Sequence, residues 1–280
     1  RLRMSRLRQV VDGIVNRPAS EKTPVAWEDS PYAFCGSCGA CEQAITRHDD
    51  LLQVADMRRS QRSKITAAGI RTLDSFATFE GAIPDLNPRV QGNLQAQARA
   101  QLRSRQTRDG LFFEFDRPDG LLAIPDPSDG DIFFDFEGDP LYTEGQEHGL
   151  DYLFGWVSAD EEFSWLWADS LAEEKIALEE FVDRVMDAKA TYPDMHVYHY
   201  ASYEQTHLLQ LAQRHGTREE EVDELVRDQV LINLLPVVKN SLRLGLPSYS
   251  IKYLEKVYLS SARGGGVTTA VDSVIDYHLY

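Results

Sequence analysis

Two acidic side chains, Asp135 and Glu137, stand in the otherwise apolar segment DIFFDFEGDP. Residues i and i+2 of a strand share a face, so a strand here would project both carboxylates together. Two neighbouring carboxylates repel each other, and burial raises that cost. A divalent cation such as Mg²⁺ or Mn²⁺ relieves both problems because it takes oxygen ligands. The spacing therefore predicts a catalytic metal site on this strand. An exposed strand edge is the alternative.

A third acid, Glu204, lies in HYASYEQTHL, at the start of a predicted helix that directly follows a predicted strand. A helix start beside the end of a parallel strand is a common place for a ligand. Alone, Glu204 would be interpreted as an acid stabilised by the helix dipole. Together with the Asp135 and Glu137 pair, it is predicted to complete a metal site.

Two other residues are candidates for contact with nucleic acid. The ring of Tyr203 could stack on a terminal base, since aromatic faces bind bases without sequence preference. Lys252, in SYSIKYLE, could reach a phosphate. For both side chains, packing against the protein is the alternative.

The three cysteines, Cys35, Cys38 and Cys41, lie at spacings of three residues in PYAFCGSCGAC. This clustering is typical of metal or cluster ligation in a reducing compartment and not of a disulfide framework. Thiolates suit zinc or an iron–sulfur cluster. His48 could be a fourth ligand to Zn²⁺, or a cysteine outside the chain could complete a [4Fe-4S] cluster. Three reduced thiols in a loop are the alternative.

The acids require a scaffold, and the surrounding pattern supplies one. Strands are expected at 152–157 and 163–167, a helix at 171–190, a strand at 195–200, a helix between Ser202 and Gly216, and then further helix and strand. Three strands in meander followed by helix–strand–helix–strand is the order of a ribonuclease-H-like fold. In that order the first strand carries the acids.

Charge divides the chain of 280 residues. The net charge is −16, but residues 1–110 hold 17 Lys and Arg against 12 acids, and residues 111–280 hold 12 against 33. We therefore expect a helical region at 1–110, a linker or first strand at 111–130 and an α/β domain at 131–280. The sequence contains no run of about 18 apolar residues that would predict a membrane span. No secretory signal is recognised, and a cytoplasmic location is expected.

The basic region contains a helix–turn–helix pattern, ITAAGIRTLDSFA, that resembles a helix-hairpin-helix unit. Such a unit offers backbone N–H groups at a helix start to a phosphate. Arg62, Lys64 and Arg71 surround the pattern and are the predicted nucleic-acid contacts. A plain helical pair with a solvated basic face is the alternative.

Three segments, IFFDFEGDP, VYHYASYEQTHLLQLA and LPSYSIKYLEKVY, resemble the YprB-type ribonuclease-H-like domain of the DEDD exonuclease superfamily. The first two match the superfamily's first two motifs. The cysteine segment, DDLLQVA and GIRTLDSFA resemble the stretch before that domain in bacterial RecB-like nucleases. The resemblance covers roughly residues 25–280.

The resemblance implies a two-metal 3′-to-5′ exonuclease on single-stranded DNA, with RNA as another substrate, in a larger DNA-repair protein that carries a helicase module. Asp135 and Glu137 match the first motif and Glu204 the second, where Asp is commoner. Asn233 stands where related chains often have an acid. The superfamily's last acid has no match, because Asp272 and Asp276 resemble the stretch that precedes the helix carrying that acid. We therefore expect the chain to be a fragment, which could be inactive alone. The alternative is a non-catalytic nucleic-acid-binding module with the same fold.

Overall fold

The structure is a computed structural model that describes residues 38–259 and 270–279, together with Gln9, Asp12, Gly13, Asn16 and Trp27. The chain forms two compact units, Arg1–Ala98 and Arg99–Tyr280. The division falls inside helix α5 (Pro88–Gln106), whereas the charge pattern predicts a boundary near residue 110. The second half of α5 packs in the second unit, where Ser104 Oγ accepts a hydrogen bond of 2.8 Å from the N–H of Phe112. No helix among the described residues is long and apolar enough to cross a membrane.

The first unit is helical, as its sequence predicts. Buried apolar residues such as Leu51, Ile65 and Phe76 form its core. The turn between α3 and α4 contains Gly69 at φ +86°, a conformation that favours glycine, so the helix–turn–helix pattern is confirmed. Between residues 38 and 98, the helices besides the start of α5 are α2 (Gly39–Arg47), a 3-10 helix (Leu51–Gln53), α3 (Arg59–Ala67) and α4 (Leu73–Thr78).

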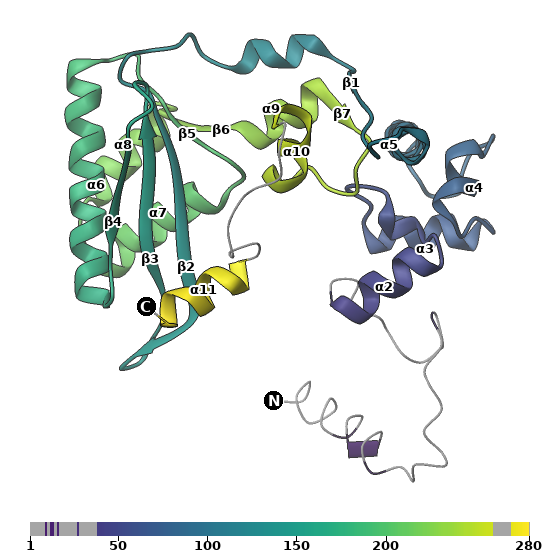
Figure 1. The fold of residues 1–280 in the computed structure, drawn as a ribbon, viewed down its shortest axis with the longest axis horizontal. Coiled ribbons are helices and arrows are strands. Elements are labelled where there is room, and N and C mark those ends of the chain that lie inside the picture. The colour runs from purple at the N-terminus through teal and green to yellow at the C-terminus, as the bar shows by residue number, and fades with distance from the viewer. Residues whose placement is uncertain are drawn as a thin grey trace. The chain divides into compact units, whose positions relative to one another are not determined.

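The second unit is built on a five-stranded sheet of order β4-β3-β2-β5-β6 (Figure 1). Strands β2, β3 and β4 are antiparallel neighbours, whereas β2, β5 and β6 run parallel. The predicted mixed α/β sheet with flanking helices is therefore confirmed. The strands are β2 (Ile132–Glu144), β3 (Glu147–Ser158), β4 (Phe163–Trp167), β5 (Val197–His199) and β6 (Leu231–Asn233).

One face of this sheet carries the main core. Ile132, Phe134 and Phe136 alternate along β2 and pack with Phe154 and the apolar side of the flanking helices. Phe181 of α6 stacks on Phe134 with ring centroids 4.0 Å apart. The helices behind this face are α6 (Leu171–Thr191), α7 (Tyr203–His215) and α8 (Glu219–Arg227) (Figure 1).

Several elements differ from the predicted pattern. The hairpin of β2 and β3 is longer than the predicted strands because it continues past two register shifts in β2, one after Glu137 and one after Asp139. A small second sheet pairs β1 (Phe113–Phe115) with β7 (Leu242–Leu244), and β1 lies within residues 111–130, the predicted linker or first strand. The remaining elements are a 3-10 helix (Pro118–Ala123), α9 (Leu234–Ser241), α10 (Ile251–Tyr258) and α11 (Ala270–Leu279).

Candidate active site

The three predicted catalytic acids meet in one cavity of about 630 Å³ in the second unit. Asp135 and Glu137 project from β2 on the face opposite the core, and Glu204 approaches from the first turn of α7. The cavity also receives Tyr203 and Lys252, the two residues of this unit predicted to contact nucleic acid. Further lining residues, none of them predicted as a site residue, include Asp139, Asp151, His207, Gln210 and Arg214.

Asp135 is electrostatically strained. Its side chain is open to solvent on the cavity side, but the surrounding protein still removes part of its hydration. This desolvation, together with the charges of Glu204 and Glu137 and a hydrogen bond to Glu204, raises the pKa of Asp135 to about 7. The N–H of Phe136, 3.0 Å from Asp135 Oδ1, opposes the shift only in part. A cation bound here would relieve the repulsion among the three acids.

Glu204 is 3% exposed and is held by the end of strand β5. His199 Nδ1 lies 3.1 Å from Glu204 Oε2, in a pair that is buried on both sides. The sequence pattern indicates only a structural role for His199, and this contact makes it the residue that orients a candidate ligand. Its Nε2 is buried without a hydrogen-bond partner among the described residues.

The loop between β5 and α7 is fixed by Asn233. Its Oδ1 accepts hydrogen bonds from the N–H of Ala201 at 3.1 Å and from the N–H of Leu235 at 3.0 Å. Ala201 has φ +80°, a strained value for a residue with a Cβ, and the bond to Asn233 helps to hold it. Asn233 thus caps α9 and positions the loop that leads to Glu204.

Gly138 leaves room for a close approach by Asp151 of β3. A Cβ on Gly138 would lie 2.4 Å from Asp151 Oδ1 and 3.0 Å from the Tyr203 hydroxyl. Tyr203 donates to Asp151 Oδ1 at 3.0 Å, and burial and the nearby acids raise the pKa of Tyr203. His207 Nδ1 lies 2.6 Å from Asp151 Oδ2, and the His207 ring stacks on Tyr203 with centroids 3.7 Å apart.

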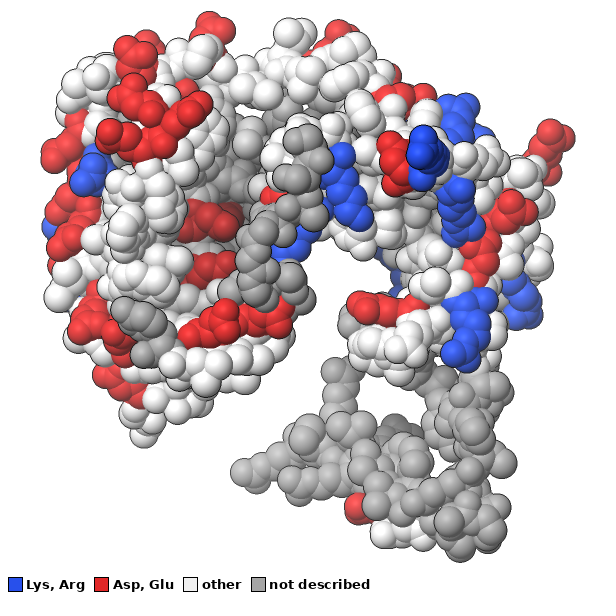
Figure 2. All heavy atoms as spheres, viewed as in Figure 1, with Lys and Arg blue, Asp and Glu red and all other residues white. Residues whose placement is uncertain are grey.

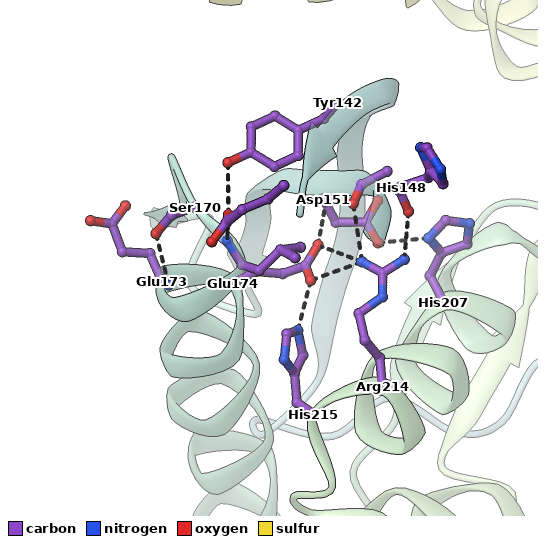
Figure 3. Close-up of polar contacts among 12 residues, drawn as sticks. Tyr142, His148, Asp151, Ser170, Glu173, Glu174, His207, Arg214 and His215 are labelled. Carbon is purple, nitrogen blue, oxygen red and sulfur yellow. Dashed lines mark hydrogen bonds and ion pairs between the residues drawn. The ribbon is translucent and has the colours of Figure 1, made fainter. Parts of the chain in front are cut away.

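A buried polar cluster surrounds the backbone of Asp151 (Figure 3). Glu174 of α6 is fully buried and accepts from the N–H of Asp151 at 2.6 Å. Its carboxylate also lies 3.0 Å from Arg214 Nη1 and 2.7 Å from His215 Nε2, both from α7. The cluster therefore ties β3 to α6 and α7, and it fixes the backbone that carries Asp151.

Asp139 lines the cavity and contacts the C-terminal helix α11. Asp139 is 2% exposed, accepts from the N–H of Leu141 at 2.8 Å and lies 2.9 Å from His278 Nε2 of α11. Tyr277 of the same helix stacks on Tyr152 with centroids 4.1 Å apart. Asp272 and Asp276 are not among the lining residues.

The three basic residues of the first unit that were predicted to contact nucleic acid differ in their exposure to solvent. Arg62 is 7% exposed, and its Nε donates to Asp50 Oδ1 at 2.8 Å while Nη2 contacts Oδ2. Arg62, which the sequence pattern predicts to contact nucleic acid, thus has its guanidinium buried against a carboxylate of the protein itself. Lys64, which donates to the carbonyl of Asp85, and Arg71 are exposed. Figure 2 shows further Lys and Arg on this unit.

Two of the three cysteines can be placed. Cys38 is exposed and precedes α2, and Cys41 is buried in the first turn of that helix. Cys35 lies outside the described residues. His48, the predicted fourth ligand to zinc, is exposed at the end of α2 and stacks on Trp27 with centroids 6.3 Å apart.

The donor set of the cavity suits a hard divalent cation. Asp135, Glu137 and Glu204 offer only carboxylate oxygens, and the charges of the two glutamates help to raise the pKa of Asp135. Among residues 38–259 and 270–279, however, no three His, Cys, Asp or Glu side chains are arranged tightly enough to hold an ion. The chemistry of the three side chains thus fits such a cation, although their present spacing is too wide to hold one. Binding of a cation would draw the carboxylates together.

The comparison with known families agrees with this architecture. A family model described as RNase H superfamily matches residues 132–280, more than half of the chain. The chain therefore belongs to the RNase H superfamily, which confirms the ribonuclease-H-like fold and indicates nuclease-type chemistry. The match begins at the first residue of β2 and includes all three acids. No curated protein and no solved structure matches the chain.

Proposed function

We propose that the chain is a metal-dependent nuclease that hydrolyses phosphodiester bonds at the cavity between β2 and α7. The observation that carries the proposal is the convergence of Asp135, Glu137 and Glu204 in one cavity of a ribonuclease-H-like unit. Two of these acids come from the first strand of the sheet, and the third comes from a helix that is distant in sequence.

Asp135, Glu137 and Glu204 would hold Mg²⁺ or Mn²⁺. When bound, two such ions activate a water molecule and stabilise the leaving oxygen of a phosphodiester. His199 keeps the Glu204 carboxylate in place, and Asp151 keeps Tyr203 and His207 against the cavity wall. Lys252, at the cavity edge, would contact a phosphate of the substrate.

The resemblance to DEDD exonucleases supports a more specific proposal, which is 3′-to-5′ degradation of single-stranded DNA by a two-metal mechanism. RNA is the alternative substrate. Lys64 and Arg71 of the first unit would contribute phosphate contacts, and a helicase module and a role in DNA repair would belong to the complete protein.

Hydrolysis of end-labelled single strands in Mn²⁺ tests this proposal. We expect a ladder of products shortened from the 3′ end by the parent protein, and no products from Asp135→Asn or Glu204→Gln. Asp160→Asn changes an exposed acid in the turn between β3 and β4 and is the control. Equal activity of the parent and Asp135→Asn would refute hydrolysis at this cavity.

A non-catalytic nucleic-acid-binding module is the second candidate. One observation supports this candidate. The two further acids that line the cavity, Asp139 and Asp151, already accept hydrogen bonds from, or face, other groups of the protein itself. Tight binding of single strands by a folded protein that hydrolyses none in Mn²⁺ or Mg²⁺ would select this candidate.

We further propose that Cys35, Cys38 and Cys41 bind a [4Fe-4S] cluster with a ligand outside the chain, or Zn²⁺ with His48. Cys38 and Cys41 are three residues apart at the start of α2, which places them on one side of the helix. Anaerobic purification followed by visible absorption and metal analysis separates iron from zinc. Neither metal at one equivalent would leave the cysteines as reduced thiols.

A further inference from the structure

The catalytic strand β2 and the edge strand β4 carry side chains on the same face of the sheet. In the register of the sheet, Asp135 lies opposite Gly155, and Gly155 lies opposite Trp165. The neighbouring rows join Glu137 through Leu153 to Trp167, and Phe133 through Val157 to Phe163. Directly opposed residues point to the same side of a sheet. The aromatic residues of β4 therefore stand on the face that carries the acids, roughly 10 Å from β2.

These aromatic side chains are unusually exposed. Phe163, Trp165 and Trp167 are 59%, 52% and 53% exposed, although the intervening Leu166 packs against the core on the other face. Their spacing along the strand is about 6.6–6.8 Å per step of two residues. Single exposed apolar residues are ordinary, but three large aromatics in a row on an edge strand mark an interaction surface.

The rings are already arranged as stacking faces. Phe163 and Trp165 lie with centroids 5.4 Å apart and planes 21° from parallel. Trp167 lies nearly parallel to the buried ring of Tyr152, 6.0 Å away, and to Tyr277 of α11, 6.4 Å away, so both rings support its orientation. Such side chains lose little conformational freedom when another flat ring is added.

Charge decides which part of a nucleic acid such a face would accept. No Lys or Arg occurs between Arg117 and Lys175, so β2, β3 and β4 contain neither residue to pair with a phosphate. Figure 2 shows a largely uncharged surface over β3 and β4 beside the acidic side chains over β2. Bases, which are uncharged and flat, match that surface, whereas phosphates do not.

Gly155 lies between Asp135 and Trp165 in the sheet, and the ring of Phe163 lies over it. A glycine in the middle of a strand often marks the close approach of a ligand. A Cβ there would meet only ordinary contacts, the nearest being Phe163 Cε2 at 3.5 Å. The backbone therefore does not require glycine for steric reasons, and the Phe163 ring extends the aromatic surface across Gly155 toward β2.

We propose that Phe163, Trp165 and Trp167 form a platform on which unpaired bases of a single-stranded nucleic acid stack while its backbone enters the acid cavity. This inference rests on the proposed nuclease function and specifies its substrate as a strand with accessible bases. Paired bases are stacked inside a duplex and could not use the platform.

Anisotropy of a labelled oligothymidylate tests the platform, in EDTA, where the proposed metal site cannot act, and in Ca²⁺. Alanine at both Trp165 and Trp167 should weaken binding roughly five- to 150-fold for each base that no longer stacks. Phenylalanine at both positions should retain most of the affinity. Phe115→Ala, an exposed aromatic on β1, is the matched control and should leave the affinity unchanged.

An abasic oligomer of the same length separates bases from phosphates. The parent should bind the abasic oligomer more weakly than it binds oligothymidylate. The double alanine variant should bind the abasic oligomer with the same affinity as the parent does. The proposal is overturned if the parent binds no oligomer in either buffer, or if the double variant binds like the parent. It is also overturned if the parent self-associates and the double variant does not, since the surface would then join two copies.

Failure of the proposed function has a different signature. Loss of hydrolysis in Mn²⁺ with tryptophan-dependent binding in EDTA would remove the nuclease and leave the platform. Hydrolysis that depends on Asp135, combined with unchanged binding by the double variant, would remove the platform and leave the nuclease.

Discussion

His199 at the end of β5 and Glu204 in the first turn of α7 form a buried pair, with Nδ1 and Oε2 3.1 Å apart. The pair links the sheet to the helix that supplies the third acid. Because residues behind a metal ligand set its orientation, the pair predicts that His199 acts on the site through Glu204.

His199→Phe should therefore lower Mn²⁺ affinity about 10- to 100-fold, as removal of a supporting residue typically does. It should also cost about 1–3 kcal/mol of stability, because it leaves a buried carboxylate without its partner. His199→Asn, whose amide N–H can reach the same oxygen, should recover most of the affinity. Calorimetry and denaturant unfolding provide the two readouts. Equal Mn²⁺ affinity of the Phe variant and the parent would exclude the positioning role.

Asp135→Asn should stabilise the metal-free protein by about 0.5–2 kcal/mol. The change removes a charge that desolvation and the nearby Glu204 and Glu137 disfavour. Asp139→Asn is the contrasting variant and should destabilise, because the Asp139 carboxylate accepts from Leu141 and faces His278. Thermal unfolding in EDTA measures both. A lower melting temperature for Asp135→Asn would show that the three acids are not in conflict.

Arg62→Met should destabilise the first unit by about 3 kcal/mol, because it leaves Asp50 buried without its main partner. Lys64→Met changes an exposed cation of the same helix and should stay within about 0.5 kcal/mol of the parent. Denaturant unfolding compares the two variants. If both unfold alike, the buried pair is not structural.

The same pair predicts an acid dependence. Burial would raise the pKa of Asp50, but hydrogen bonds from Arg62, Leu52 and Trp27 outweigh it, so the pKa is lowered. A carboxyl group with a lowered pKa in the folded state stabilises fully above its unfolded pKa of about 3.9. The contribution is lost as the pH falls below about 4 toward the folded pKa. Denaturant unfolding between neutral pH and about pH 3 should show this loss in the parent and a smaller one in Arg62→Met.

Gly138→Ala should cost about 1–3 kcal/mol, because its Cβ would collide with Asp151 and force it away from Tyr203. Gly155→Ala is the matched control in the same sheet, since its Cβ meets only ordinary contacts. Chemical denaturation compares the two variants. If Gly138→Ala leaves the stability unchanged, the position of Asp151 does not depend on the absence of a side chain at Gly138.

The sequence was informative where a local pattern had one physical explanation. Asp135 and Glu137 in an apolar strand predicted two carboxylates on one face, and the order of strands and helices predicted the sheet. Glu204 could be placed because a helix that follows a parallel strand begins at the same sheet edge.

The supporting residues could not be predicted because they depend on register and long-range packing. Asp151 meets Tyr203 and His207 only after a register shift in the β2–β3 hairpin, and Glu174 reaches Asp151 from a separate helix. One signal was present, a carboxylate within the apolar run LDYLFGWV. A basic segment likewise does not reveal that Arg62 is the cation buried against Asp50.

Mn²⁺ binding by calorimetry on the parent, Asp135→Asn and Asp160→Asn tests the central claim most directly. We expect the parent and Asp160→Asn to bind with similar affinity and Asp135→Asn to lose binding while it remains folded. Binding that survives in Asp135→Asn, or no binding by a folded parent, would contradict a metal site on β2.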